Sequence, residues 1–293
     1  MKFKLFNETF LKSIEKDLKD LFDADEISEA KKMNVKPNAV FAVKREPMYF
    51  TGKFDAKTVF VMLNPGNDTG ENYSFKKKCK SNYSDYDHYF NDYMERHILW
   101  GEKDDGRMDN FDLKQAAFLF DFKQSGIDLP DFSSTSEINI KLKAKRNVLM
   151  EKLQLELVPY CSREFKGVLD TLKQAKENLE IFIPHIERLL DAIVSYERKY
   201  VVFGSRQFEY LLKAYKEKTQ NTKIEFIVED YFAKVDDLAK EVSFSIVKIT
   251  HRNKTFHAII ANTFPRRDLP NAYRQMRDYG ELCWEGILKH INN

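Results

Sequence analysis

The stretch that decides the fold covers residues 58–68 and reads TVFVMLNPGND. Its first six residues form a continuous β-prone run with apolar side chains on both faces, which favours a buried parallel strand. The next residues, Asn64, Pro65 and Gly66, favour a tight polar turn. Ligands of open α/β sheets bind at the carboxyl ends of the strands. We therefore expect a ligand site at this turn.

Three more segments follow the same pattern along the chain. Strands are predicted at 153–158, 200–205 and 256–261, and each ends in polar or turn-forming residues. Because predicted helices separate most of these strands, the pattern indicates an α/β protein with a parallel sheet. The carboxyl ends of parallel strands open on one edge, so we expect all four ends to meet in one cleft.

The remaining segments predict further strands and a set of helices. Strands are expected at 223–228 and 244–250. Helices are expected at 8–32 with Asn7 as the N-cap, at 113–124, 140–152, 178–196, after Ser205, and near 271–291. We interpret residues 1–50 as a helical extension packed on the core and residues 51–293 as one α/β domain.

Composition excludes several classes of protein. The 48 Lys and Arg residues nearly balance the 46 Asp and Glu residues, so any nucleic-acid contact must come from local patches. A hydrophobic content of 43% is enough for a packed core. Three distant cysteines and the lack of a long apolar run lead us to expect a cytoplasmic monomer without a membrane segment, metal or other cofactor.

The ordered strand ends resemble those of the uracil-DNA glycosylase superfamily, most closely its mismatch-specific thymine/uracil branch. The likeness covers roughly residues 58–277 and is closest at Leu63-Asn64-Pro65-Gly66. Leu157-Val158-Pro159-Tyr160 resembles the second family motif, and Val201-Val202-Phe203-Gly204 resembles the third. The last family motif carries a His before basic residues. Here Asn262 stands near that place, ahead of Arg266 and Arg267.

The resemblance implies a three-layer α/β/α sandwich around a short central parallel sheet. It also implies a DNA partner, from which a damaged or mismatched uracil-type base is flipped out and excised by hydrolysis of the N-glycosidic bond. On this likeness Asn64 would hold the attacking water and Asp68 would assist. Donors near Asn262 would stabilise the charge that develops on the departing base.

The predicted binding residues flank the four strand ends. Base contacts are expected from Pro65, Gly66, Tyr160 and Phe75, with Tyr73 as the alternative stacking ring. Phosphate contacts are expected from side chains that carry a positive charge or a hydroxyl group. These are Lys76, Lys77, Ser162, Arg163, Ser205, Arg266 and Arg267.

Two alternatives remain open at this stage. Because the motif His is absent, the chain could be a catalytically inactive nucleic-acid or nucleotide binding module with the same fold. A third hypothesis is an interaction protein whose tyrosine-rich segment 83–93 binds another protein. Exposed tyrosines would support the third hypothesis, and buried ones would remove its main support.

Overall fold

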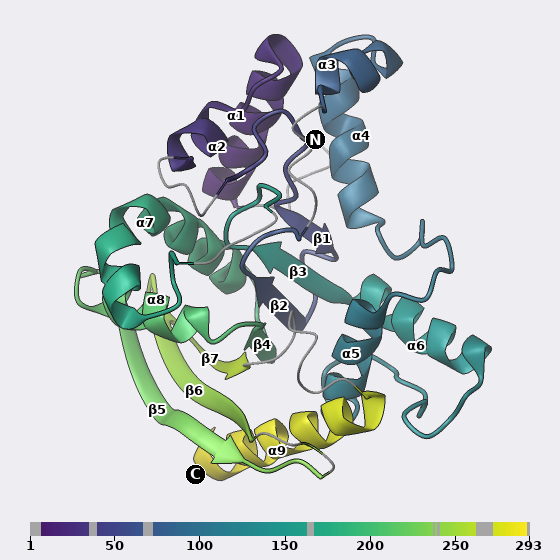
Figure 1. Ribbon diagram of the computed structural model, residues 1–293, viewed down its shortest axis with the longest axis vertical. Coiled ribbons are helices and arrows are strands. Elements are labelled where there is room, and N and C mark those ends of the chain that lie inside the picture. The colour runs from purple at the N-terminus through teal and green to yellow at the C-terminus, as the bar shows by residue number, and fades with distance from the viewer. Residues whose placement is uncertain are drawn as a thin grey trace.

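A computed structural model describes residues 7–34, 40–66, 73–162, 167–236, 238, 241–261 and 272–291. In these residues the chain forms an α/β structure around a seven-stranded sheet with the order β1-β3-β2-β4-β7-β6-β5 (Figure 1). The strands are β1 Phe50–Gly52, β2 Thr58–Met62, β3 Lys152–Glu156, β4 Tyr200–Phe203, β5 Thr222–Ala233, β6 Val242–His251 and β7 Lys254–Ala261.

The expectation of a short central parallel sheet holds only for the parallel centre, because the sheet has seven strands and is mixed. Only β3, β2, β4 and β7 run parallel to one another. Strand β1 pairs antiparallel with β3, and β5 and β6 add an antiparallel edge beside β7. The turn between β6 and β7 holds Arg252 and Asn253 with positive φ angles of 49° and 62°, which suits a two-residue hairpin. The sheet is therefore mixed.

Helices lie on both faces of this sheet (Figure 1). Helices α1 Glu8–Ala24, α7 Leu172–Val194 and α8 Gln207–Lys216 pack on one face, and α5 Asn110–Leu119, α6 Ile138–Glu151 and α9 Tyr273–Ile291 pack on the other. The remaining elements are α2 Ser28–Met33, α3 Phe75–Lys78, the 3-10 helix η1 Lys80–Asn82 and α4 Tyr86–Ile98. This arrangement is compatible with an α/β sandwich.

Most predicted elements occur with shifted ends. Asn7 caps α1 by accepting from the backbone N–H groups of Thr9 and Phe10, as predicted. The helix expected over 8–32 is two helices, because Asp25 takes a left-handed conformation at the C-cap of α1. Helix α7 begins earlier than expected, where the Thr171 side chain caps its first turn.

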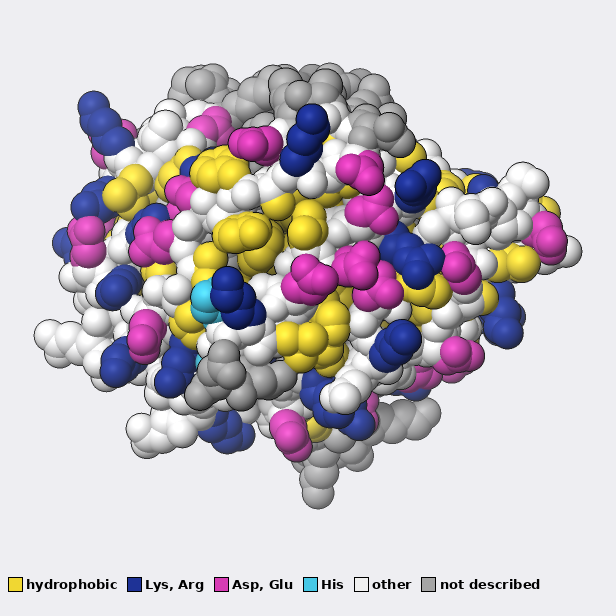
Figure 2. Space-filling view, turned by 90° about the horizontal axis from the view of Figure 1, so that it is seen from below, with side chains coloured by type: hydrophobic (Ala, Val, Ile, Leu, Met, Phe, Trp, Pro, Cys, Tyr) yellow, Lys and Arg dark blue, Asp and Glu magenta, His cyan; other side chains and the backbone are white. Residues whose placement is uncertain are grey.

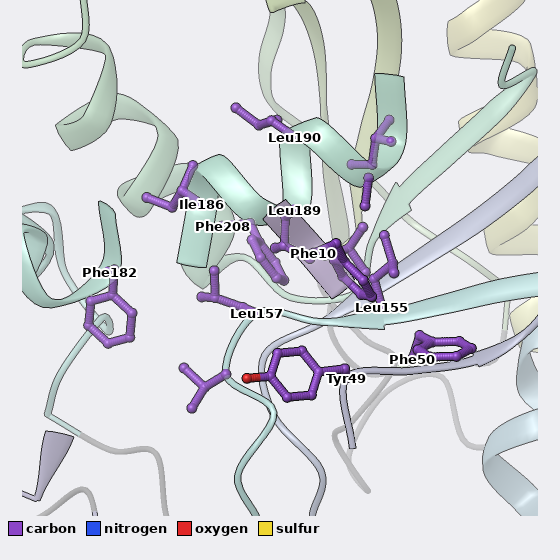
Figure 3. Packing of buried hydrophobic residues seen from close by; sticks show 14 of the residues in the cluster. Phe10, Tyr49, Phe50, Leu155, Leu157, Phe182, Ile186, Leu189, Leu190 and Phe208 are labelled. Carbon is purple, nitrogen blue, oxygen red and sulfur yellow. The ribbon is translucent and has the colours of Figure 1, made fainter. Parts of the chain in front are cut away.

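The alternation of side chains along each strand divides the core into two clusters. On β2, Val59 and Val61 join the cluster with α1, α7 and α8, whereas Phe60 joins the cluster with α5 and α9. Figure 3 shows part of the first cluster, where Ile186 and Leu189 of α7 gather with side chains of β3. Because both sheet faces are covered, polar groups on the inner strands are buried unless they reach the carboxyl edge.

The helices carry no membrane-spanning signature. Within the parts of the chain that the structure describes, no helix is both long enough and apolar enough to cross a bilayer.

Candidate functional site

The carboxyl ends of three parallel strands meet at one edge of the sheet. Gly204 N–H donates to the Val61 carbonyl at 2.9 Å, and Val158 N–H donates to the Leu63 carbonyl at the same distance. Beyond the strands, Ser162 N–H donates to the Pro65 carbonyl at 3.3 Å. The predicted turns after β2, β3 and β4 therefore form one continuous rim.

A cleft of about 970 Å³ opens along this rim. The turns after β2 and β4 line it together with the side of β3, the loop before β1, the end of α4 and the start of α5. Six of the predicted site residues line it: Asn64, Pro65, Gly66, Tyr73, Ser162 and Ser205. The structure thus brings together residues that lie up to 141 positions apart in the sequence, from Asn64 to Ser205.

Two aromatic residues predicted to bind the base are directed into the core. Phe75 is 1% exposed and its ring lies 4.7 Å from that of Tyr89. Tyr160 is also 1% exposed, and its hydroxyl donates to Asp17 Oδ2 at 2.6 Å. Neither side chain lines the cleft, whereas the alternative ring, Tyr73, does.

Some of the predicted phosphate-binding and catalytic residues line the cleft, and others lie away from it or outside the described residues. Lys76 and Lys77 are exposed on α3 and do not line the cleft. Five predicted residues lie outside the described parts of the chain, and their roles stay predictions: Asp68, Arg163, Asn262, Arg266 and Arg267.

A ladder of polar side chains on β3 was missed by the sequence reasoning. Lys152, Gln154 and Glu156 alternate with leucines and pair in register with Thr58, Phe60 and Met62 of β2. All three polar residues line the cleft although they are buried. The signal was the alternating run KLQLEL at 152–157, in which one face of an inner strand is polar.

Hydrogen bonds connect the ladder into a directed chain. Lys152 Nζ donates to Gln154 Oε1 at 3.1 Å, and Gln154 Nε2 donates to Glu156 Oε1 at 2.8 Å. Lys152 Nζ also donates to Asp112 Oδ1 at 2.9 Å and to Gln115 Oε1 at 2.5 Å, both on α5. The charge of Lys152 is therefore balanced by Asp112, and the far end of the ladder is the Glu156 carboxyl group.

The burial of Glu156 favours the protonated form of its carboxyl group at neutral pH. Burial raises the pKa of its carboxyl group from 4.5 to about 8, against the lowering effects of the hydrogen bond from Gln154 and of the Lys152 charge. Its Oε2 atom is buried and has no hydrogen-bond partner among the described residues. A neutral carboxyl group whose Oε1 already accepts can donate a hydrogen bond from Oε2.

The wall formed by α4 adds a clamped arginine and a neutral imidazole. Arg96 holds Glu46 through two hydrogen bonds of 2.9 and 3.0 Å and Asp92 through a third of 2.7 Å. His97 Nδ1 lies 2.8 Å from the Tyr93 carbonyl oxygen, and burial lowers the His97 pKa to about 4. Trp100, which is 41% exposed, continues this wall outward.

The tyrosine-rich segment 83–93 is largely a packing surface. Tyr89 and Tyr93 are fully buried, and Tyr83, Tyr86 and Phe90 pack against the same cluster. The hypothesis of an aromatic docking surface for another protein therefore loses its main support.

Comparisons with known proteins add no identification. No protein-family model matches this sequence, and no curated protein matches it significantly. In the described residues no group of three or more His, Cys, Asp or Glu side chains is arranged to hold a metal ion.

Proposed function

We propose that this protein is a hydrolase of N-glycosidic bonds that excises a uracil-type base from DNA after flipping it out of the stack. The observation that carries this proposal is the cleft at the carboxyl edge, where Asn64, Ser162 and Ser205 meet. Its volume of about 970 Å³ is suited to a small organic ligand.

In this reaction the bond between C1′ of the sugar and the ring nitrogen of the base breaks, and its electron pair leaves with the base. A water oxygen bonds to C1′, and a proton of that water ends on the base. Asn64 Nδ2 donates to the Pro65 carbonyl at 3.2 Å, which orients the amide group. In the proposal the Asn64 side-chain oxygen holds the attacking water near C1′.

The cleft walls offer surfaces for the rest of the flipped nucleotide. Tyr73 lies beneath two cations, with Arg45 Cζ at 5.6 Å and Lys78 Nζ at 5.0 Å from its ring centre. Its ring and that of Trp100 are the aromatic candidates for stacking, since both line the cleft. Ser162 and Ser205 carry hydroxyl groups that suit phosphate or sugar oxygens.

The test is release of free uracil by the full chain from oligonucleotides that carry uracil opposite guanine or in single strands. We expect release by the natural protein and a loss of at least about 100-fold in Asn64→Ala, because the variant can no longer position the water. Asn91→Ala is a matched control, since Asn91 is an exposed asparagine on α4 outside the cleft. Equal release by the natural protein and Asn64→Ala would contradict the proposal.

A binding module without turnover is the second candidate, and the acids of the cleft favour it. Among the described residues that line the cleft, Glu46 is paired with Arg96 and Asp112 with Lys152. Asp109 accepts from the Phe111 N–H at 2.7 Å, and burial raises the pKa of Glu156 to about 8. Three of these four acids are thus paired or favour the neutral form, which leaves the exposed Asp109 as the described carboxylate of the cleft that can take a proton from water. Binding of uracil-containing DNA without base release would favour this candidate.

A further inference from the structure

The inner wall of the cleft contains an incomplete hydrogen-bond arrangement. Glu156 is 2% exposed, and its Oε2 has no partner among the described residues while its Oε1 accepts from Gln154. Leaving a buried polar atom unpaired costs about 1–3 kcal/mol. The surrounding residues provide several polar groups, yet none of those described reaches this atom. A ligand atom in the cleft can complete the arrangement.

The direction of the ladder determines what kind of ligand atom fits. Lys152 donates to Gln154, and Gln154 donates to Glu156, so the bond from Lys152 orients the Gln154 amide group. Gln154 Nε2 can only donate, which assigns the acceptor role to Glu156 Oε1. The remaining oxygen of the neutral carboxyl group is then an O–H donor. Its natural partner is an acceptor oxygen.

We propose that Glu156 donates a hydrogen bond from Oε2 to a ring carbonyl oxygen of the pyrimidine bound in the cleft. This inference rests on the proposed function and names a substrate contact within the same site. When the glycosidic bond breaks, negative charge develops on the base and its carbonyl oxygens, so this bond strengthens in the transition state. The proton stays with Glu156, and no net transfer is required.

Glu156 thereby supplies a donor to the departing base from β3. The family that the sequence resembles places a His in its last motif, where this chain has Asn262. A neutral carboxylic acid held in an apolar surrounding is an established kind of donor to a developing oxyanion. We therefore infer that β3 contributes a donor whose strength depends on the protonation state of one carboxyl group.

Several charged and titratable groups line the cleft together with Glu156, and none of the described ones contacts its Oε2. Its backbone N–H donates to the Tyr49 carbonyl, and on the opposite face of the sheet Arg188 Nη2 lies 3.4 Å from its carbonyl oxygen. The other groups come from the ladder, from the two helices at the cleft and from the rim. They are Lys152, Asp112, His97, Arg45, Glu46, Arg96, Asp109, Tyr73 and Cys161.

Among the described residues that line the cleft, Glu156 is the group whose pKa is raised to about 8. Burial lowers the His97 pKa to about 4 and raises the Cys161 pKa above its ordinary value of 9.0. Lys152 is paired with Asp112, and Glu46 with Arg96. A change of ligand affinity between neutral and mildly alkaline pH that is absent from Glu156→Gln therefore reports the Glu156 carboxyl group.

The experiment is a ligand-observed NMR titration of free uracil against the full chain at about pH 6.5 and about pH 9. At one pH unit above its pKa about a tenth of Glu156 is protonated, so the natural protein should bind uracil about tenfold more weakly at the higher pH. Glu156→Gln keeps a donor at the same place without the titration. This variant should therefore bind uracil at both pH values. Any pH dependence that it shows measures the ionisation of uracil itself.

Glu156→Leu removes the donor at similar volume and should bind weakly at both pH values, with a thermal melt to confirm that it is folded. The inference is overturned if the natural protein does not bind uracil, if it follows the same pH profile as Glu156→Gln, or if folded Glu156→Leu binds like the natural protein. Base release without this profile would leave the proposed function standing and refute the Glu156 contact. The predicted pH profile of uracil binding without base release would support the Glu156 contact and refute the proposed function.

Discussion

Two buried carboxyl groups in this protein lie on opposite faces of the sheet and are built differently. Asp17 of α1 accepts hydrogen bonds on Oδ2 from the Tyr49 and Tyr160 hydroxyl groups, both at 2.6 Å. Glu156 of β3 accepts one bond on Oε1 and leaves Oε2 unpaired among the described residues. Burial raises the pKa of both groups.

The difference separates a structural acid from a candidate functional one. The Asp17 bonds tie α1 to the segment before β1 and to the turn after β3, within a closed part of the core. The Glu156 bonds end at the wall of the cleft. A saturated buried acid stabilises the fold, whereas an unsaturated one retains capacity for a ligand at a cost in stability.

The largest expected effect concerns the stability of the protein as a function of pH. The Glu156 pKa is raised from 4.5 to about 8, so the folded state binds more protons than the unfolded state between these values. Stability is therefore lost as pH rises through this window, by about 4 kcal/mol in total. We expect Glu156→Gln to remove this loss in urea unfolding curves measured from about pH 4.5 to pH 9. A natural protein whose stability curve parallels that of the variant would contradict the raised pKa.

Removing the saturated acid should cost stability at every pH. Asp17→Ala leaves the buried Tyr160 hydroxyl without its acceptor, which costs about 1–3 kcal/mol. It also removes the nearer of two acceptors of the Tyr49 hydroxyl, which keeps the Ser13 carbonyl at 3.1 Å. We expect a decrease of about 3 kcal/mol in the free energy of unfolding, measured with urea at neutral pH. Glu156→Gln at the same pH should not destabilise the protein. An equal loss in both variants would show that the two acids have the same role.

The acid side of the stability curve should depend on His97. Burial lowers its pKa from 6.5 to about 4, so the unfolded state takes up a proton between these values while the folded state does not. Stability falls as pH decreases through this window, by about 2 kcal/mol at pH 4.5. We expect His97→Phe to reduce that fall. His185 is also buried and has a lowered pKa, but it lies outside the cleft, so it is the histidine with which His97 is compared. An unchanged decrease in stability at acid pH in His97→Phe would contradict this assignment.

The smallest expected effect tests Tyr160, which the sequence assigned to base binding. Tyr160→Phe removes one hydrogen bond to Asp17 and should lower the free energy of unfolding by about 1 kcal/mol. Base release should stay within about twofold of the natural protein, because the ring does not line the cleft. A large loss of release at unchanged stability would instead support the sequence-based assignment.

The sequence predicted the parallel centre of the sheet because its strands are continuous apolar runs. Runs such as residues 58–62 and 200–203 are short and rich in β-branched and aromatic residues, which favours strands over helices. Strand β1 was missed because it has only three residues and includes Gly52 at a φ of 93°. The antiparallel edge was missed because pairing direction depends on the hairpin turn, which the apolar pattern does not record.

The rim of the site was predictable, and its interior was not. Asn64 and Ser162 follow strand ends, where a local pattern marks them. The ladder depends on contacts such as Lys152 with Asp112, 40 positions apart, which no local spacing predicts. The polar face of β3 lies along the strand and not at its end, so a pattern of strand ends does not mark it.

The surface of the protein carries charges of both signs. On the face seen in Figure 2, Lys and Arg side chains are interspersed with Asp and Glu side chains, with apolar groups between them. This agrees with the near balance of charges in the sequence. The proposed DNA contact therefore depends on local groups at the rim of the cleft.

The most direct test of the central claim is a crystal structure of the full chain with uracil bound at saturating concentration. We predict the pyrimidine ring in the cleft between Asn64 and the β3 ladder, with one of its carbonyl oxygens within about 3 Å of Glu156 Oε2. Uracil bound elsewhere on the protein, or in the cleft with Glu156 Oε2 still unpaired, would contradict the account.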